Sequence, residues 1–224
     1  MIKIMKVFAL EAQEWKVAER NGLSKSVCKE VVNETLEKSK KLMPLLSPYV
    51  NVLLRAHSEK AVPEIAVGGE TYDSELILLS FDESAPHGKK SLLEQLKATT
   101  YHEANHAARF AWIAKAKIYE QTLITGAIWE GLATVCERDY GKTQPEWGKY
   151  NDDESMLKWF QELISADERK EQWSKWAFKR EDGRHWLAYK VGTWIIDKVI
   201  ENTDHTVSEL TGMPSGKILK LAGL

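Results

Sequence analysis

The sequence predicts an α+β fold that is mainly helical, with one small antiparallel sheet in its first half. Three observations lead to this prediction. Apolar residues recur at helical spacing near the start of the chain and over most of its second half. Between these parts, residues 51–82 hold short apolar runs separated by glycine and polar residues, as in strands and turns. This order of helices, a small sheet and more helices is typical of an α+β domain.

The first part of the chain predicts one helix followed by strands. Ser24 begins the segment SKSVCKEVVNETLEKSKKLMPLL, which has apolar residues at helical period and ends at prolines. Residues 51–58, NVLLRAHS, are expected to form a short strand. Residues 63–82 predict a hairpin, with two apolar runs on either side of Gly68-Gly69 and a polar turn.

The second part of the chain predicts helices throughout. A long helix is expected over 91–116, because leucines in its first turns are followed by alanines and aromatic residues at helical spacing. Further helices are expected at 122–139, 153–165, 168–179 and 184–202, and the segment EDG breaks the chain before the last of them.

Length and composition limit the classes of protein to consider. A chain of 224 residues can bury one sizeable core, so we expect one compact unit, with an N-terminal helical segment (1–50) packed on a domain formed by 51–224. The net charge of -2 argues against a nucleic-acid partner, and no apolar run is long enough for a membrane span or a signal peptide. Cys28 and Cys136 give no disulfide framework, which favours the cytoplasm. The sequence does not indicate whether the protein is a monomer or an oligomer.

The segment YHEANHAARF carries the strongest chemical signal in the chain. On a helix, residues four apart share a face, so His102 and His106 point the same way and can bind one Zn²⁺ ion. Glu103 follows the first histidine, where it can take a proton from a water molecule beside the metal, as in H-E-x-x-H metallopeptidases. The alternative is an amphipathic helix with two solvated histidines.

A catalytic zinc site needs a third protein ligand, and Glu130 is the candidate. It lies in the segment GAIWEGLATVCE, among bulky apolar residues, where a glutamate is costly to bury unless it is paired or coordinated. The alternative is an acid near a helix N-terminus that is favoured by the helix dipole.

Together, HEANH and GAIWEGLA resemble the zinc site of gluzincin metallopeptidases, in which a second helix supplies a glutamate ligand; Glu130 is the residue that matches. The chain is also similar to a bacterial family of predicted zinc-dependent proteases, with a strand hairpin before the motif and a Y-x-x-G element, here Tyr189 to Gly192. The resemblance covers about residues 60–200. It implies a zincin-like catalytic domain, Zn²⁺ as cofactor, and a peptide or small protein as substrate.

The sequence departs from this resemblance at one position. Several gluzincins have an aspartate four residues after the glutamate ligand, where it orients a histidine ligand, but this chain has Thr134 there. Orientation of the histidines would then come from a backbone carbonyl or from another acid such as Glu137.

Peptide hydrolysis also needs a donor for the oxyanion and a place for the substrate. His185 and Tyr189 stand four apart in the last predicted helix, so either could reach over the metal, and Gly192 would let that helix approach another closely. An extended substrate could pair with the edge of the sheet, for which the strand SELILLSFD, 74–82, is the candidate. The alternatives are a core tyrosine, a histidine at a helix start and a strand that only covers the core.

The sequence therefore favours a zinc metallopeptidase with Glu103 as general base. One alternative is a metallopeptidase-like module that binds a peptide or protein partner without cutting it, but such a module has no need of Glu103. Another takes Glu103 to His106 as half of a di-iron ExxH site. That site requires a second such motif, and the nearest is Asp182-x-x-His185.

Overall fold

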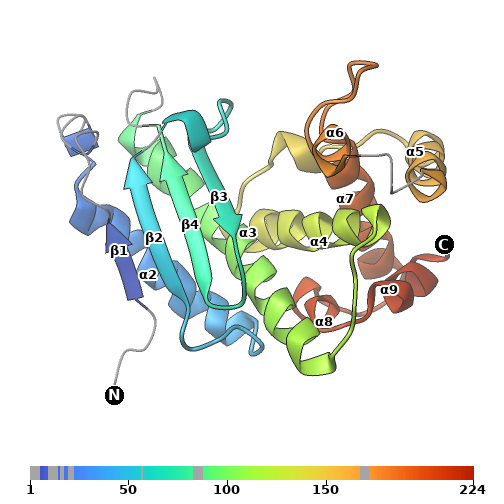
Figure 1. Ribbon diagram of the computed structural model, residues 1–224, viewed down its shortest axis with the longest axis horizontal. Coiled ribbons are helices and arrows are strands. Elements are labelled where there is room, and N and C mark those ends of the chain that lie inside the picture. Colours follow the sequence, from blue (N-terminus) through green and yellow to red (C-terminus); the bar gives the residue numbers. More distant parts are fainter. Residues whose placement is uncertain are drawn as a thin grey trace.

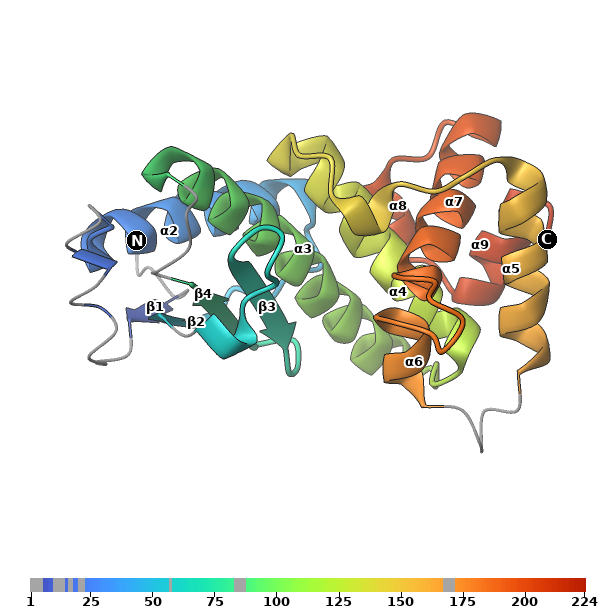
Figure 2. The same cartoon turned by 90° about the horizontal axis from the view of Figure 1, so that it is seen from above.

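The computed structural model describes residues 6–9, 15, 18–19, 23–56, 58–82, 88–166 and 172–224. The sheet and α2 lie at one end of the molecule and α4 to α9 at the other, while α3 extends from the sheet to the helical end (Figure 1, Figure 2). The fold is mainly helical with one small sheet, which agrees with the α+β class that the sequence predicted. Within the described part of the chain, no helix has the length and apolar character needed to cross a membrane.

The sheet is mixed rather than antiparallel, which corrects the sequence prediction. Its strands are β1 (Lys6–Ala9), β2 (Asn51–Ala56), β3 (Val67–Thr71) and β4 (Leu76–Phe81), in the order β1-β2-β4-β3. β2 is parallel to both β1 and β4, and the β3–β4 pair is antiparallel. The parallel pairing has a physical basis: α2 connects β1 to β2 as a crossover helix, and five of the six residues of β4 are buried, as in a strand covered on both faces.

The edge strand next to the helical end is β3, and not the segment 74–82 that the sequence suggested. β4 lies between β2 and β3, so both of its edges are paired. Gly68 and Gly69 are within β3 rather than in the turn of the hairpin. A Cβ atom on Gly68 would lie 2.1 Å from the carbonyl oxygen of Lys60. Glycine is therefore needed here because the two backbone segments lie too close together for a side chain.

The N-terminal part contributes a strand as well as a helix. Val7 of β1 is buried, and the strand was missed by sequence analysis because four residues carry little periodicity. α2 (Lys25–Leu42) begins where Ser24 accepts a hydrogen bond from the backbone N–H of Val27. Its apolar face, which includes Val32 and Leu36, packs in the core that continues under the sheet and along α3.

The helical end is built around α3 (Lys89–Ala116) and α4 (Leu123–Cys136). A π-helical turn, η2 (Glu137–Gly141), extends α4. α5 (Asp153–Ser165) matches its predicted bounds, whereas α7 (Leu187–Asn202) begins three residues later than expected. The remaining elements are η1 (Ser58–Lys60), η3 (Glu146–Gly148), α6 (Trp173–Ala177), α8 (Val207–Thr211) and α9 (Ser215–Ala222). α8 and α9 were not predicted. Of the helix expected at 168–179, residues 168–171 lie outside the described residues, and α6 lies within the rest.

α4 and α7 cross at two glycines. A Cβ on Gly131 would lie 2.2 Å from the carbonyl carbon of Gly192, and one on Gly192 would lie 1.8 Å from the carbonyl oxygen of Ala127. The two backbones are therefore in direct contact, because a side chain at either position would force them apart. This confirms the expectation that Gly192 lets its helix approach another closely, and it sets the position of Tyr189 at the start of α7.

Candidate metal centre

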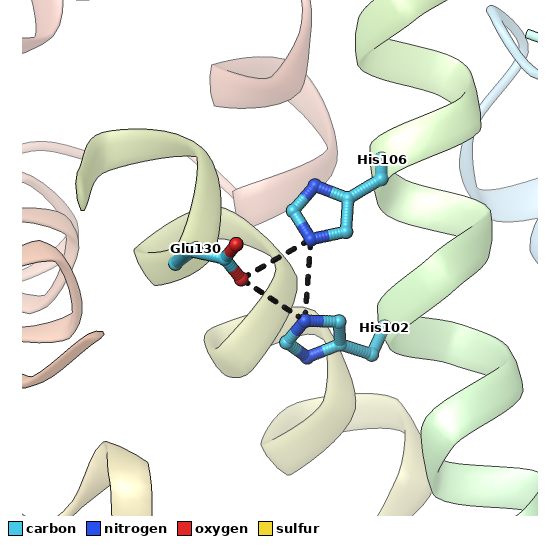
Figure 3. A group of neighbouring side chains, drawn as sticks. All are labelled: His102, His106 and Glu130. Carbon is cyan, nitrogen blue, oxygen red and sulfur yellow. Dashed lines mark hydrogen bonds and ion pairs between the residues drawn. The ribbon is translucent and has the colours of Figure 1, made fainter. Parts of the chain in front are cut away.

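Three side chains from two helices converge at one point. His102 and His106 lie one turn apart on α3, and Glu130 faces them from α4 (Figure 3). The two histidine Nε2 atoms are 3.2 Å apart. The Oε2 atom of Glu130 is 3.3 Å from Nε2 of His102 and 3.2 Å from Nε2 of His106. All three side chains are largely buried, with 9%, 13% and 15% of their surface exposed.

This geometry fits a metal ion. Zinc binds imidazole nitrogen and carboxylate oxygen at about 2.0–2.2 Å, and two ligands at a tetrahedral angle are then about 3.3 Å apart. The three separations in the cluster match that value. No other group of three described histidine, cysteine or acidic side chains shares this arrangement. The residues present therefore fit a zinc ion with three protein ligands.

A second carboxylate orients His102 from behind. Glu137 follows Glu130 by seven residues, two helical turns, so both acids face α3. The Nδ1 atom of His102 is 3.1 Å from Oε2 of Glu137, whose side chain is 1% exposed. Thr134 makes no such contact, and its buried hydroxyl has no hydrogen-bond partner among the described residues. The sequence left open whether a backbone carbonyl or another acid such as Glu137 orients the histidine. The structure places Glu137 beside His102.

Charges within the cluster are coupled. Burial lowers the pKa of His102, but hydrogen bonds to Glu130 and Glu137 outweigh it and raise that pKa well above its usual value. Burial raises the pKa of Glu130, yet the two histidines lower it far below the usual range of a glutamate. The imidazole and the carboxylate thus favour each other's charged form, and a metal cation that binds there competes with a proton for the same atoms.

Glu103 lies between the cluster and the edge strand β3. The hydroxyl of Thr71 donates to Oε2 of Glu103 at 2.7 Å, and a Cβ on Gly69 would lie 2.4 Å from Oε1. Gly69 therefore leaves the space that the carboxylate occupies. Burial raises the pKa of Glu103, while His102, His106 and the hydrogen bond from Thr71 lower it in part. The net result is a carboxylate whose pKa is raised above that of an ordinary glutamate.

Tyr189 covers the cluster from α7. Its ring stacks on that of His102, with the ring centroids 6.3 Å apart. Burial raises the pKa of the phenol well above its usual value, and the charges of Glu130 and Glu103 raise it further. The hydroxyl group therefore stays protonated and remains a hydrogen-bond donor across the physiological range.

His185 does not share the position of Tyr189. α7 begins at Leu187, because Trp186 before it adopts a left-handed conformation with φ of 60°. His185 is exposed, lies on the segment before the helix and pairs through its backbone with Lys179. It lines neither cavity beside the cluster. Asp182, the partner needed for a di-iron site, instead pairs with Arg184, 2.7 Å away.

Two cavities flank the cluster, of about 470 Å³ and 300 Å³. Both are lined by His102, Glu103, Tyr189 and Trp173, and the smaller cavity is also lined by His106 and Glu130. The larger cavity adds aromatic side chains that sequence analysis did not assign to the site: Trp147, Phe178 and Trp186. The signal for them was the concentration of tryptophan in the second half of the chain, where eight of the nine lie between 112 and 194.

Comparison with known proteins gives one match. A family model described as "Predicted Zn-dependent protease (DUF2268)" matches residues 28–220, which include the whole cluster. No curated protein and no solved structure matches the chain. Since the family model covers most of the chain, the protein belongs to this family of predicted Zn-dependent proteases.

Proposed function

We propose that the protein is a zinc-dependent peptidase of the gluzincin type, with a zincin-like catalytic domain. His102, His106 and Glu130 hold the zinc ion. One observation carries the proposal: three ligand atoms at tetrahedral spacing, with a buried glutamate directly beside them. Membership of a family described as predicted Zn-dependent proteases supports the choice of metal and reaction.

The protein side chains divide the chemistry among them. A bound zinc ion would polarise both a water molecule and the carbonyl group of the substrate. Glu103 accepts a proton from that water as its oxygen attacks the carbonyl carbon. The carboxylate then passes the proton to the amine that leaves when the peptide bond breaks. The hydrogen bond from Thr71 fixes the orientation of Glu103.

Tyr189 is the proposed donor to the oxyanion. The substrate carbonyl oxygen gains negative charge as the tetrahedral intermediate forms, and a fixed donor then lowers the energy of the transition state. The ring of Tyr189 is held over His102 by stacking and by the close contact of α7 with α4. His185 has no part in this proposal, since it lies on an exposed segment before α7 and lines neither cavity.

The edge of β3 is the proposed binding site for an extended peptide or a segment of a small protein. Tyr72 donates its N–H to the carbonyl oxygen of Leu76, and bonded positions alternate along an antiparallel pair. The odd-numbered residues Gly69 and Thr71 therefore direct their backbone groups away from β4. Within the described sheet no strand pairs with that side. A peptide that adds there as a further strand passes directly beside Glu103.

We also propose a cytoplasmic location. The two cysteines, Cys28 and Cys136, are buried and unpaired, which suits a reducing compartment. Burial raises the pKa of Cys28 to about 11, so its thiol stays protonated and unreactive.

The test uses the purified protein loaded with one equivalent of zinc and a diverse peptide mixture, with products identified by mass spectrometry. Wild-type protein is expected to cut peptides. Glu103→Gln is expected to keep its zinc and to lose about 10²–10⁴-fold in rate, because the amide cannot accept a proton. Glu94→Gln, on the exposed face of the same helix, is the matched control and should behave as wild type.

Three outcomes separate the interpretations. Loss of cleavage in Glu103→Gln alone supports the peptidase. Tight zinc binding without cleavage of any peptide by the wild type would favour a non-catalytic module that binds a peptide or protein partner. Failure of the wild type to bind zinc would contradict the proposal as a whole.

A further inference from the structure

The larger cavity has an aromatic wall that connects directly to the metal centre. The ring of Trp186 lies 5.6 Å from that of Trp147, 5.6 Å from that of Phe178 and 5.5 Å from that of Tyr189, measured between centroids. Tyr189 in turn stacks on His102. The contacts of Trp186 with Phe178 and Tyr189 are edge-to-face, which is a favourable geometry for aromatic rings.

The opposite wall of this cavity is apolar as well. It comes from the sheet and the segment before β3, through Val62, Ile65, Val67 and Leu78. At about 470 Å³, the cavity is within the range of pockets that bind ligands. Two exposed residues of opposite charge, Lys60 and Glu70, also line it, together with His102, Glu103 and Glu137 of the site.

The segment that carries Phe178 and Trp186 has an unfavourable backbone conformation at Trp186. Trp186 has φ 60° and ψ 31°, the left-handed region, which a bulky side chain rarely adopts and which is enriched at functional sites. Its backbone N–H donates to the carbonyl oxygen of Phe178 at 2.9 Å, and Arg180 donates likewise to Arg184 at 2.9 Å, so a small hairpin holds both rings.

This hairpin is not needed to fill the core. Phe178 is 50% exposed and Trp186 is only partly buried, although both are large apolar side chains. Apolar rings that remain open to a cavity beside a reaction centre offer surface to a ligand, because covering them removes apolar area from water.

We propose that the larger cavity is a specificity subsite for a bulky aromatic side chain, on the substrate residue next to the bond that is cut. Trp186 and Phe178 are its specificity-determining residues. The inference rests on the proposed peptidase function. A peptide paired with the open positions of β3 lies beside Gly69 and Glu70, which line both cavities, so a residue beside the cut bond is within reach of this wall.

The test measures binding apart from cleavage. Zinc-loaded Glu103→Gln protein is titrated calorimetrically with two blocked pentapeptides, one of alanines only and one with phenylalanine at the central position. The phenylalanine peptide is expected to bind about 10–30-fold more tightly, as the burial of one aromatic side chain predicts.

Trp186→Gly, made in the Glu103→Gln protein, is the decisive variant. Glycine removes the ring and also suits the left-handed backbone, so the strain relieved at this position offsets part of the packing lost with the ring. We expect the preference for phenylalanine to fall below about 3-fold, and Phe178→Leu to reduce it in part. Tyr119→Leu, which changes an aromatic residue 80% exposed and outside both cavities, is the matched control and should keep the full preference.

The subsite and the peptidase can fail separately. Equal binding of the two peptides, binding of neither, or an undiminished preference in Trp186→Gly would overturn the subsite. Cleavage of many peptides by the wild type without aromatic preference would do the same and leave the peptidase intact. A preference for phenylalanine that Trp186→Gly removes would support the subsite even if the wild type cut nothing.

Discussion

His102 has a carboxylate at each of its two ring nitrogens. Glu137 is hydrogen-bonded to Nδ1, and Glu130 approaches Nε2 from the other side. When the Nδ1–H group donates to Glu137, the lone pair of Nε2 faces the centre of the cluster, which is the tautomer that a metal ligand needs. The orientation that many zinc sites obtain from an aspartate thus comes here from a glutamate on a π-helical turn.

Glu137→Gln should weaken zinc binding by about 10–100-fold while the fold is retained, because the amide keeps the shape of the side chain but loses the negative charge that supports His102. Competition with a chelator of known affinity measures the change. Glu146→Gln, at an exposed glutamate, serves as control. An unchanged zinc affinity in Glu137→Gln would mean that Glu137 does not orient the ligand.

Tyr189→Phe should lower kcat by about 10–10³-fold and leave KM and zinc content nearly unchanged, since it removes one donor that acts mainly in the transition state. Steady-state kinetics and metal analysis on one preparation test this. A tyrosine that only packs would give a different result, with lower thermal stability and an intact kcat.

The cluster itself could be predicted from sequence because its spacing is local. His102, Glu103 and His106 are fixed relative to one another by one turn of helix. Glu130 could be predicted because a glutamate among apolar neighbours is costly to bury without a partner. Thr71 and the aromatic wall could not be predicted, since they reach the site from segments that come together only through the fold.

At the scale of elements, helices were easier to predict than strand pairing. α2 and α5 follow from amphipathic periodicity and side-chain caps at Ser24 and Asp152, which are local signals. The strand that pairs with β1 is more than 40 residues away, and the four residues of β1 carry no signal for that pairing. Gly68 and Gly69 were misassigned to a turn, because glycine marks turns and close contacts alike.

Gly192→Ala should destabilise the protein by about 3 kcal/mol, because the new methyl group meets backbone atoms of α4 that cannot move aside. For a chain of this size that corresponds to a fall in Tm of roughly 6–12 °C, measurable by calorimetry. Gly216→Ala, on α9 with open space around it, is the control and should be neutral or slightly stabilising. Equal effects of the two substitutions would argue against direct contact between α4 and α7.

At the scale of the whole molecule, the metal centre joins its two ends. α3 contacts the sheet through β3 and β4, and α4 packs on α7, while the cluster takes ligands from both α3 and α4. An ion bound there ties together residues 28 positions apart and, through their helices, both ends of the fold.

Zinc should therefore stabilise the folded protein. At a free concentration about 100 times its dissociation constant it adds about 2.7 kcal/mol, or roughly 5–10 °C in Tm for a chain of this length. Calorimetry with zinc and with excess chelator measures the shift. Glu130→Ala should show almost none, and an equal shift in that variant would indicate that zinc acts elsewhere.

The open edge of β3 is as available to another copy of the chain as it is to a substrate. If two such edges met antiparallel, Gly69 of one copy would pair with Thr71 of the other, and Glu70 would face its own counterpart. Opposed like charges at the closest position of a ladder disfavour that pairing. A single exposed carboxylate on a five-residue strand thus disfavours this pairing of two copies of the protein.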